Sequence, residues 1–154
     1  MPPAVLRIET AAQVDLAKAC LTTAFASDPF TRWVFADPGQ FLGLFGHALR
    51  HMGGLGGAQG TGFVAEGGKG AALWLKPGTG PDMEALGAAL AELAMPGDAP
   101  EVFGQMAAHH PQEPHWYLPF VGVDPAAQGS GVGSALLAAS LALVDADRMP
   151  AYLE

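Results

Sequence analysis

Apolar residues recur along the chain with two spacings, which predict both helices and strands. Stripes with the spacing of one helix face predict helices at residues 11–26, 39–52, 83–93 and 98–109, and from the glycines near 131 to about 147. Short apolar runs predict strands at residues 5–8, 63–66, 71–75, 116–123 and 151–153. Thr10 and Gln13 match a capping box, in which each side chain satisfies a free donor at the first helix start.

Two glycine-rich stretches separate these elements. Residues 53–62, GGLGGAQGTG, offer little to pack into a core and predict a flexible connection. Residues 67–70 lie between two expected strands and predict a hairpin turn. The order of elements, with no internal repeat or linker, predicts one domain of the α+β (mixed α/β layered) class, built on one sheet.

Composition narrows the function classes. The chain has 154 residues, of which 50% are hydrophobic and 14% charged, as in a globular domain with its own core. The net charge is −8 and the few Lys and Arg residues are not clustered, which argues against nucleic-acid binding and fits a cationic substrate such as an amine. The start of the chain lacks the pattern of a signal peptide, no apolar run could span a membrane, and the single cysteine, Cys20, forms no internal disulfide. We expect a cytoplasmic protein with Cys20 in the core.

The most informative stretch is VGVDPAAQGSGVGSALL, residues 121–137. A strand, a glycine turn and a helix start form an anion site, because the helix presents unpaired N–H groups and glycines let a ligand approach the backbone. The stretch lacks the Lys that follows the glycines of a Walker loop. Its glycines also do not have the spacing of the dinucleotide fingerprint.

The spacing instead resembles the Q/R-x-x-G-x-G/A signature of the GNAT superfamily of N-acetyltransferases, which residues 128–133 match. The resemblance extends over HWYLPFVGVDPAAQGSGVGSALL and PAYLE, which are similar to puromycin N-acetyltransferase-like members. It implies the GNAT acyl-CoA N-acyltransferase fold over residues 1–154, with a mostly antiparallel central sheet flanked by helices.

The resemblance also implies acetyl-CoA as acetyl donor. The N–H groups of residues 129–134 would hold its pyrophosphate, assisted by two side chains, and the backbone of residues 121–123 would pair with the pantetheine arm and stabilise the oxyanion. The alternative is a plain turn that needs glycine only for its geometry. The implied donor-binding residues are Val121, Gly122, Val123, Gln128, Gly129, Ser130, Gly131, Val132, Gly133 and Ser134.

Acyl transfer to an amine also needs a base for the ammonium and an acid for the thiolate. Glu154, at the tip of the last strand, is the first candidate base; the alternative is a solvated carboxylate. His115 is the second candidate, against a strand-edge histidine without a role, and Glu66 is a third. Trp33, Phe35 and Trp116 are candidates for an acceptor pocket, although we expect at least two of these three aromatic residues in the core.

The remaining histidines are expected to have no role in chemistry. His47 and His51 share a helix face but lack an acidic partner, so no metal site is predicted. His109 and His110 end a predicted helix, where a histidine interacts favourably with the helix dipole.

Family members continue after the fifth strand with a helix and two more strands, which carry the tyrosine that usually protonates the thiolate. The sequence has no counterpart of this segment, and its Tyr117 and Tyr152 lie elsewhere. We expect a truncated piece or a short gene product, with an open strand edge that supports a homo-oligomer. The predicted function is acetyl-CoA-dependent N-acetylation of a small-molecule primary amine. The alternatives are acetylation of a peptide or protein and an inactive acetyl-CoA-binding module.

Overall fold

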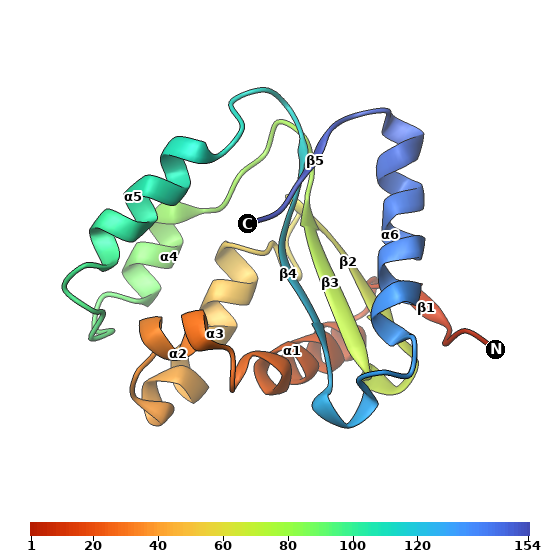
Figure 1. The fold of residues 1–154 in the computed structure, drawn as a ribbon, viewed down its shortest axis with the longest axis horizontal. Helices are drawn as coiled ribbons and strands as arrows, with labels where there is room; N and C mark the ends of the chain where they lie inside the picture. Colours follow the sequence, from red (N-terminus) through yellow and green to blue (C-terminus); the bar gives the residue numbers. More distant parts are fainter.

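A five-stranded sheet separates two layers of helices in the computed structural model, which describes residues 1–154 (Figure 1). The strands are β1 (Val5–Arg7), β2 (Gly60–Ala65), β3 (Gly70–Leu75), β4 (Trp116–Val123) and β5 (Ala151–Tyr152). The helices are α1 (Ala11–Phe25), α2 (Pro29–Val34), α3 (Pro38–His51), α4 (Met83–Ala89), α5 (Ala99–His109) and α6 (Val132–Asp147), and the short 3-10 turns are η1 (Glu66–Gly68) and η2 (Pro125–Ala127).

The sheet has the order β1-β2-β3-β4-β5, in which the first four strands are antiparallel and β5 is parallel to β4. The β3–β4 register shifts by one residue between Leu73 and Leu75, so that Leu118 and Pro119 together lie opposite Trp74. This shift is a β-bulge, and it suits Pro119, which has no N–H to give to a ladder.

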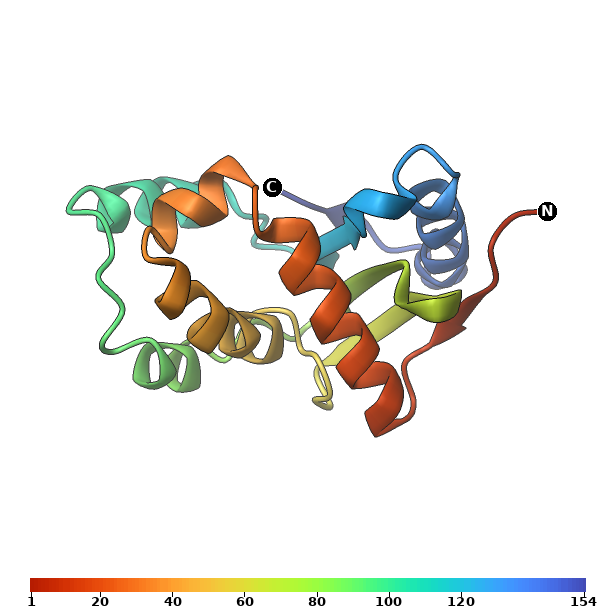
Figure 2. The ribbon, with the colours of Figure 1, turned by 90° about the horizontal axis from the view of Figure 1, so that it is seen from below.

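Each face of the sheet has its own core. Helices α1 and α3 cover one face, where Leu21, Leu49, Leu73 and Phe120 lie in one buried cluster, and α1 runs across this face in Figure 2. Helix α6 covers the other face, where Leu136 lies in a second buried cluster. Burying a leucine side chain contributes roughly 1.5–3 kcal/mol, so these clusters hold the helices on the sheet.

Most predicted elements are confirmed, including β4 at its predicted bounds and the capping box of Thr10 and Gln13. Helix α2 was not predicted. Asp28 caps it by accepting a hydrogen bond from the Thr31 N–H, and Pro29 stands in its first turn, where the missing N–H costs nothing. The Asp-Pro pair therefore ends α1 and also starts the next helix.

The prediction of a flexible connection at residues 53–62 is wrong. Leu55 is 5% exposed and belongs to the α1–α3 core, and β2 begins at Gly60. A Cβ on Gly54 would come within 2.8 Å of the Gly60 Cα, so glycine is needed here because two backbone segments touch. The stretch packs tightly through its backbone, and the small number of side chains in its sequence gave no indication of this packing.

Three further expectations can be compared with the structure. Cys20 is buried, and burial raises the pKa of its thiol, as expected for a core residue. Phe35 and Trp116 are also buried, while Trp33 is half-buried against the same core as Phe35. None of the helices combines the length and the apolar character needed to cross a membrane.

Candidate active site

The turn between β4 and α6 is held open by its own backbone. Gly129 and Gly131 have φ angles of 76° and 85°, which side chains rarely adopt, and Gly131 is the N-cap of α6. The Ser130 hydroxyl group is turned inward, because its Oγ donates a hydrogen bond to the Ala127 carbonyl. Around Gly129 and Gly131, no atom lies within 4 Å of the position that a Cβ would take.

Unpaired donors line this open space. The N–H groups of Val132, Gly133 and Ser134 make no hydrogen bond within the protein, and the first hydrogen bond of α6 runs from the Ala135 N–H to the Gly131 carbonyl. The Ser130 N–H, which was also expected to face the pyrophosphate, instead donates to the Ala127 carbonyl. The side chain of Val132 is buried against the sheet, so this residue can offer only its backbone. A hollow of about 390 Å³ lies against these groups. The donors and the glycine space fit an anionic group such as a phosphate.

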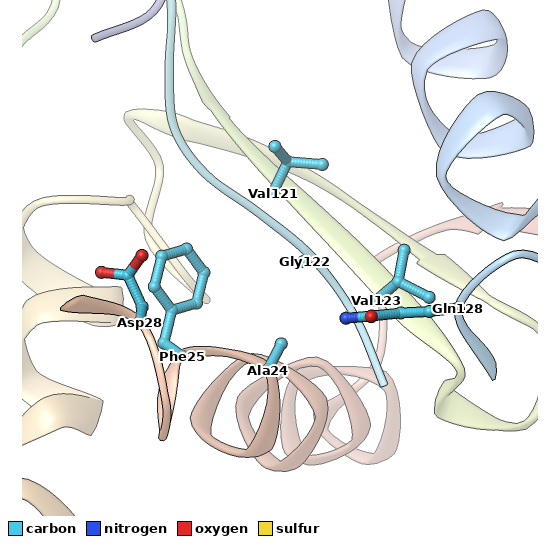
Figure 3. Close-up of a pocket in the computed structure, with 7 residues that line it drawn as sticks. All are labelled: Ala24, Phe25, Asp28, Val121, Gly122, Val123 and Gln128. Carbon is cyan, nitrogen blue, oxygen red and sulfur yellow. The ribbon is translucent and has the colours of Figure 1, made fainter. Parts of the chain in front are cut away.

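A second hollow follows β4 toward the middle of the sheet. It measures about 450 Å³ and is lined by β4 on one side and the end of α1 on the other (Figure 3). Its lining residues are Ala24, Phe25, Asp28, Val121, Gly122, Val123 and Gln128. Val123 and Gln128 line both hollows, so the two adjoin and form one groove.

The groove runs along the part of β4 that does not pair with β5. Only Trp116 and Tyr117 of β4 pair with β5, at Ala151 and Tyr152. Beyond them, residues 118–123 have no strand on this edge, and their backbone polar groups can pair with an extended ligand as with another strand.

Gly122 sets the width of the groove. A Cβ at this position would come within 2.9 Å of the Ala24 Cβ and 3.1 Å of a Leu21 methyl, so glycine lets α1 lie close to β4. The Tyr117 side chain lies on the same face of the sheet as Gly122. Successive side chains of a strand point to opposite faces, and the neighbours Trp116 and Leu118 belong to the core under α6. The bulge places Tyr117 and Gly122 on one face although they are an odd number of residues apart.

A polar cluster lies at the other end of β4, and we call it the Glu154 cluster: His110, His115, Tyr117, Tyr152 and Glu154. The Tyr117 hydroxyl donates to Glu154 Oε1 at 3.1 Å and the Tyr152 hydroxyl donates to Oε2 at 3.0 Å. His110 Nδ1 lies 3.5 Å from Oε1, an ion-pair distance that is long for a hydrogen bond. The Glu154 side chain is 19% exposed, so it is partly shielded from solvent.

The two histidines of the cluster are in contact. His115 Nε2 lies 3.1 Å from His110 Nε2, and His115 Nδ1 lies 2.7 Å from the Glu113 carbonyl. The rings of Tyr117 and Tyr152 meet the His110 ring edge-on. Burial, together with the charge and hydrogen bond of Glu154, raises the pKa of Tyr117, so its hydroxyl keeps its proton.

The cluster corrects one prediction and sharpens two. His110 was expected to act only on the helix dipole, but its ring contacts Glu154, while His109 bonds the Gln105 carbonyl at the helix end. Glu154 and His115, predicted independently as candidate bases, belong to the same cluster. Glu66 lies exposed in η1, and it lines neither hollow of the groove.

Several residues of the groove and the cluster were missed from the sequence. Ala24, Phe25 and Asp28 line the groove, and the only local signal was a helix that ends where a strand must pass.

Trp116 is excluded as a pocket wall because its indole is buried and donates to Asp147 at 3.0 Å. His47 and His51 stack on α3, and no group of three or more potential metal ligands is found.

Comparison with known families agrees with this geometry. A model described as Acetyltransferase (GNAT) family matches residues 85–154, which include the glycine turn and the Glu154 cluster. A solved structure from Corynebacterium glutamicum, described as histone acetyltransferase HPA2 and related acetyltransferase, is 32% identical. The match covers 100% of this chain and 77% of that one, with a TM-score of 0.69.

Two more distant structures share the fold. An aminoglycoside acetyltransferase from an uncultured soil metagenomic sample, in complex with trehalose, is 12% identical with a TM-score of 0.53, and the match covers 98% of this chain and 76% of that one. A GNAT family acetyltransferase from Brucella melitensis in complex with acetyl-CoA is 18% identical with a TM-score of 0.52, and the match covers 97% of this chain and 75% of that one. The mostly antiparallel sheet, its helical layers and the 32% identical relative show that the chain belongs to the GNAT family of acetyltransferases.

Proposed function

We propose that the protein transfers the acetyl group of acetyl-CoA to a primary amine of a small molecule. One observation carries the proposal: the open edge of β4 leads from an anion-binding turn to a partly shielded carboxylate. An acyl-CoA has its phosphates at one end and its thioester at the other. The groove offers hydrogen-bond donors for the phosphates and a base near the thioester.

The donor end is held by the backbone. The N–H groups of Val132, Gly133 and Ser134 face the pyrophosphate, with the Gln128 side chain at the junction of the two hollows. The unpaired edge at residues 121–123 bonds the amides of the pantetheine arm, and an N–H of this edge stabilises the oxyanion formed when the amine attacks the thioester.

The acceptor end is built around Glu154. Tyr117 and Val123 lie six residues apart on β4, or about 20 Å at 3.3 Å per residue, a span suited to an extended pantetheine arm. Glu154 Oε1 accepts the proton that the ammonium must lose before it attacks the thioester. Tyr117 and Tyr152 orient the carboxylate because each donates to one of its oxygens.

The choice of a small-molecule acceptor is supported by the resemblance of residues 115–137 and 150–154 to puromycin N-acetyltransferase-like members. A net charge of −8 also favours the approach of a cationic amine. A peptide acceptor and an inactive acetyl-CoA-binding module are the competing outcomes of the test below.

The test combines calorimetric titration of acetyl-CoA with a thiol-release assay on tyramine, spermidine, an aminoglycoside and a lysine peptide. We expect binding, turnover on a small amine, and a loss of roughly 10²–10⁴-fold in kcat for Glu154→Gln at unchanged acetyl-CoA affinity. Glu92→Gln, an exposed carboxylate outside the site, is the matched control. Binding without turnover on any amine indicates a binding module, preference for the peptide indicates a peptide acetyltransferase, and absence of binding refutes all three.

A further inference from the structure

We infer that His110 takes over the proton of the amine from Glu154 and relays a proton through His115 to solvent. The inference rests on the proposed function. It assigns to His110 a role that neither its place at a helix end nor the family signature indicated. His110 acts through Glu154 and is a positioning and relay residue.

The contacts of His115 define which ring atoms carry protons. A backbone carbonyl only accepts hydrogen bonds, so His115 Nδ1, 2.7 Å from the Glu113 carbonyl, carries a proton. One further proton lies between the Nε2 atoms of His115 and His110, which are 3.1 Å apart. When the two rings share only these two protons, His110 Nδ1 has a lone pair, and this lone pair faces Glu154 Oε1.

A proton arriving at Glu154 therefore has a second acceptor. Bound between Oε1 and Nδ1, it converts two facing acceptors into an imidazolium–carboxylate pair. Both tyrosine hydroxyls already donate to the carboxylate oxygens, whereas the lone pair of His110 Nδ1 has no donor of its own, so the ring offers the arriving proton a free acceptor.

The stoichiometry of the reaction needs such an acceptor. An ammonium that becomes an amide loses two protons: one ends on the sulfur of coenzyme A when the C–S bond breaks, and the other must leave the enzyme. We assign this other proton to the path from Glu154 Oε1 to His110 Nδ1. His110 then gives its Nε2 proton to His115, and the His115 Nδ1 proton passes to solvent beside the exposed Glu113 carbonyl.

The chemical advantage lies in basicity. Imidazole binds a proton about two pKa units more tightly than a glutamate carboxylate in water, so the pair deprotonates an ammonium roughly 100-fold more fully than a carboxylate alone. The groups that face His110 are few: His115 before β4, Tyr117 from β4, Tyr152 from β5 and Glu154 after it. Glu154 is the only carboxylate among them.

Two substitutions test the relay with the amine found by the assay above. His110→Asn keeps a donor near the Nδ1 position, and His110→Phe keeps the ring between the two tyrosines; neither can accept a proton. The readouts are the pH profile of kcat between pH 5 and 9, the affinity for acetyl-CoA and the unfolding temperature. His109→Asn and His109→Phe, at the exposed neighbour outside the Glu154 cluster, are the matched controls.

We expect kcat at neutral pH to fall by roughly 100-fold in both His110 variants, and the acidic limb of the profile to move about two pH units lower, because the carboxylate alone then acts as base. Acetyl-CoA affinity stays unchanged, since the glycine turn is untouched. The inference is overturned if the limb stays in place, whether or not kcat falls. A wild-type protein that acetylates none of the amines instead refutes the proposed function.

Discussion

Replacing Gly131 by alanine separates the two properties that glycine contributes to the turn. Gly131 has a φ of 85°, and an L-residue in the left-handed region costs about 1–2 kcal/mol. No atom lies within 4 Å of the new Cβ, so it meets no clash in the free protein. The folded state should therefore lose only this strain energy, which lowers the unfolding temperature by roughly 2–8 °C for a domain of this size.

Binding should suffer separately, because the same Cβ would occupy the space in front of the free N–H groups of Val132, Gly133 and Ser134. Hydrogen bonds to a charged group contribute about 1.5–3 kcal/mol each. Losing one or two of them raises the dissociation constant of acetyl-CoA by at least roughly tenfold. Calorimetric titration of acetyl-CoA measures this change, and thermal unfolding without ligand measures the strain.

Gly78 provides a control with the same strain. It has a φ of 77° and equally open surroundings, but it lies after β3 and lines neither hollow of the groove. Gly78→Ala should lose similar stability and bind acetyl-CoA as the wild type does. The assignment of the turn to the pyrophosphate is refuted if Gly131→Ala binds acetyl-CoA normally, or if both variants lose affinity equally.

Three further outcomes follow from burial and charge. The pKa of Tyr117 is raised in the folded protein, so the contribution of Tyr117 to stability is complete below about pH 10, the pKa of a free tyrosine, and is lost as the pH rises above it. Above that pH, the free energy of unfolding of the wild type should fall by up to about 1.4 kcal/mol per pH unit. Urea titration should show a smaller fall in Tyr117→Phe. Leu136→Ala, in the fully buried contact of α6 with the sheet, should cost about 2–5 kcal/mol in the same assay, and a cost below 1 kcal/mol would contradict the packing described for α6. The thiol of Cys20, which is 4% exposed with a raised pKa, should react with a disulfide reagent only after unfolding, and fast labelling of the native protein would contradict its placement.

Local patterns were sufficient where local physics decides the structure. Strand β4 was predicted at its observed bounds because a run of aromatic and β-branched residues is closed by Asp124 and Pro125. The donors of the glycine turn were also predictable, since free N–H groups at a helix start need no partner from elsewhere in the chain.

Contacts between distant segments could not be predicted in the same way. Tyr117 and Glu154 are 37 residues apart in the sequence, and the parallel pairing of β5 with β4 brings them together. The contact of His110 with Glu154 was hidden for the same reason: a helix-end histidine has a sufficient local explanation until Glu154 is placed beside it. The width of the groove depends on Gly122 and Ala24, which belong to different elements and carry no shared pattern.

The two ends of the groove should differ in their tolerance to mutation. The proposed donor end is built from main-chain N–H groups, which every residue except proline supplies, so most side-chain substitutions there should leave the recognition of phosphate intact unless they remove a glycine. The proposed acceptor end consists of side chains, each of which is lost by a single substitution. A scaffold divided in this way can keep one donor while its acceptor changes by small steps, and a saturation library scored separately for acetyl-CoA binding and for amine preference would show that separation.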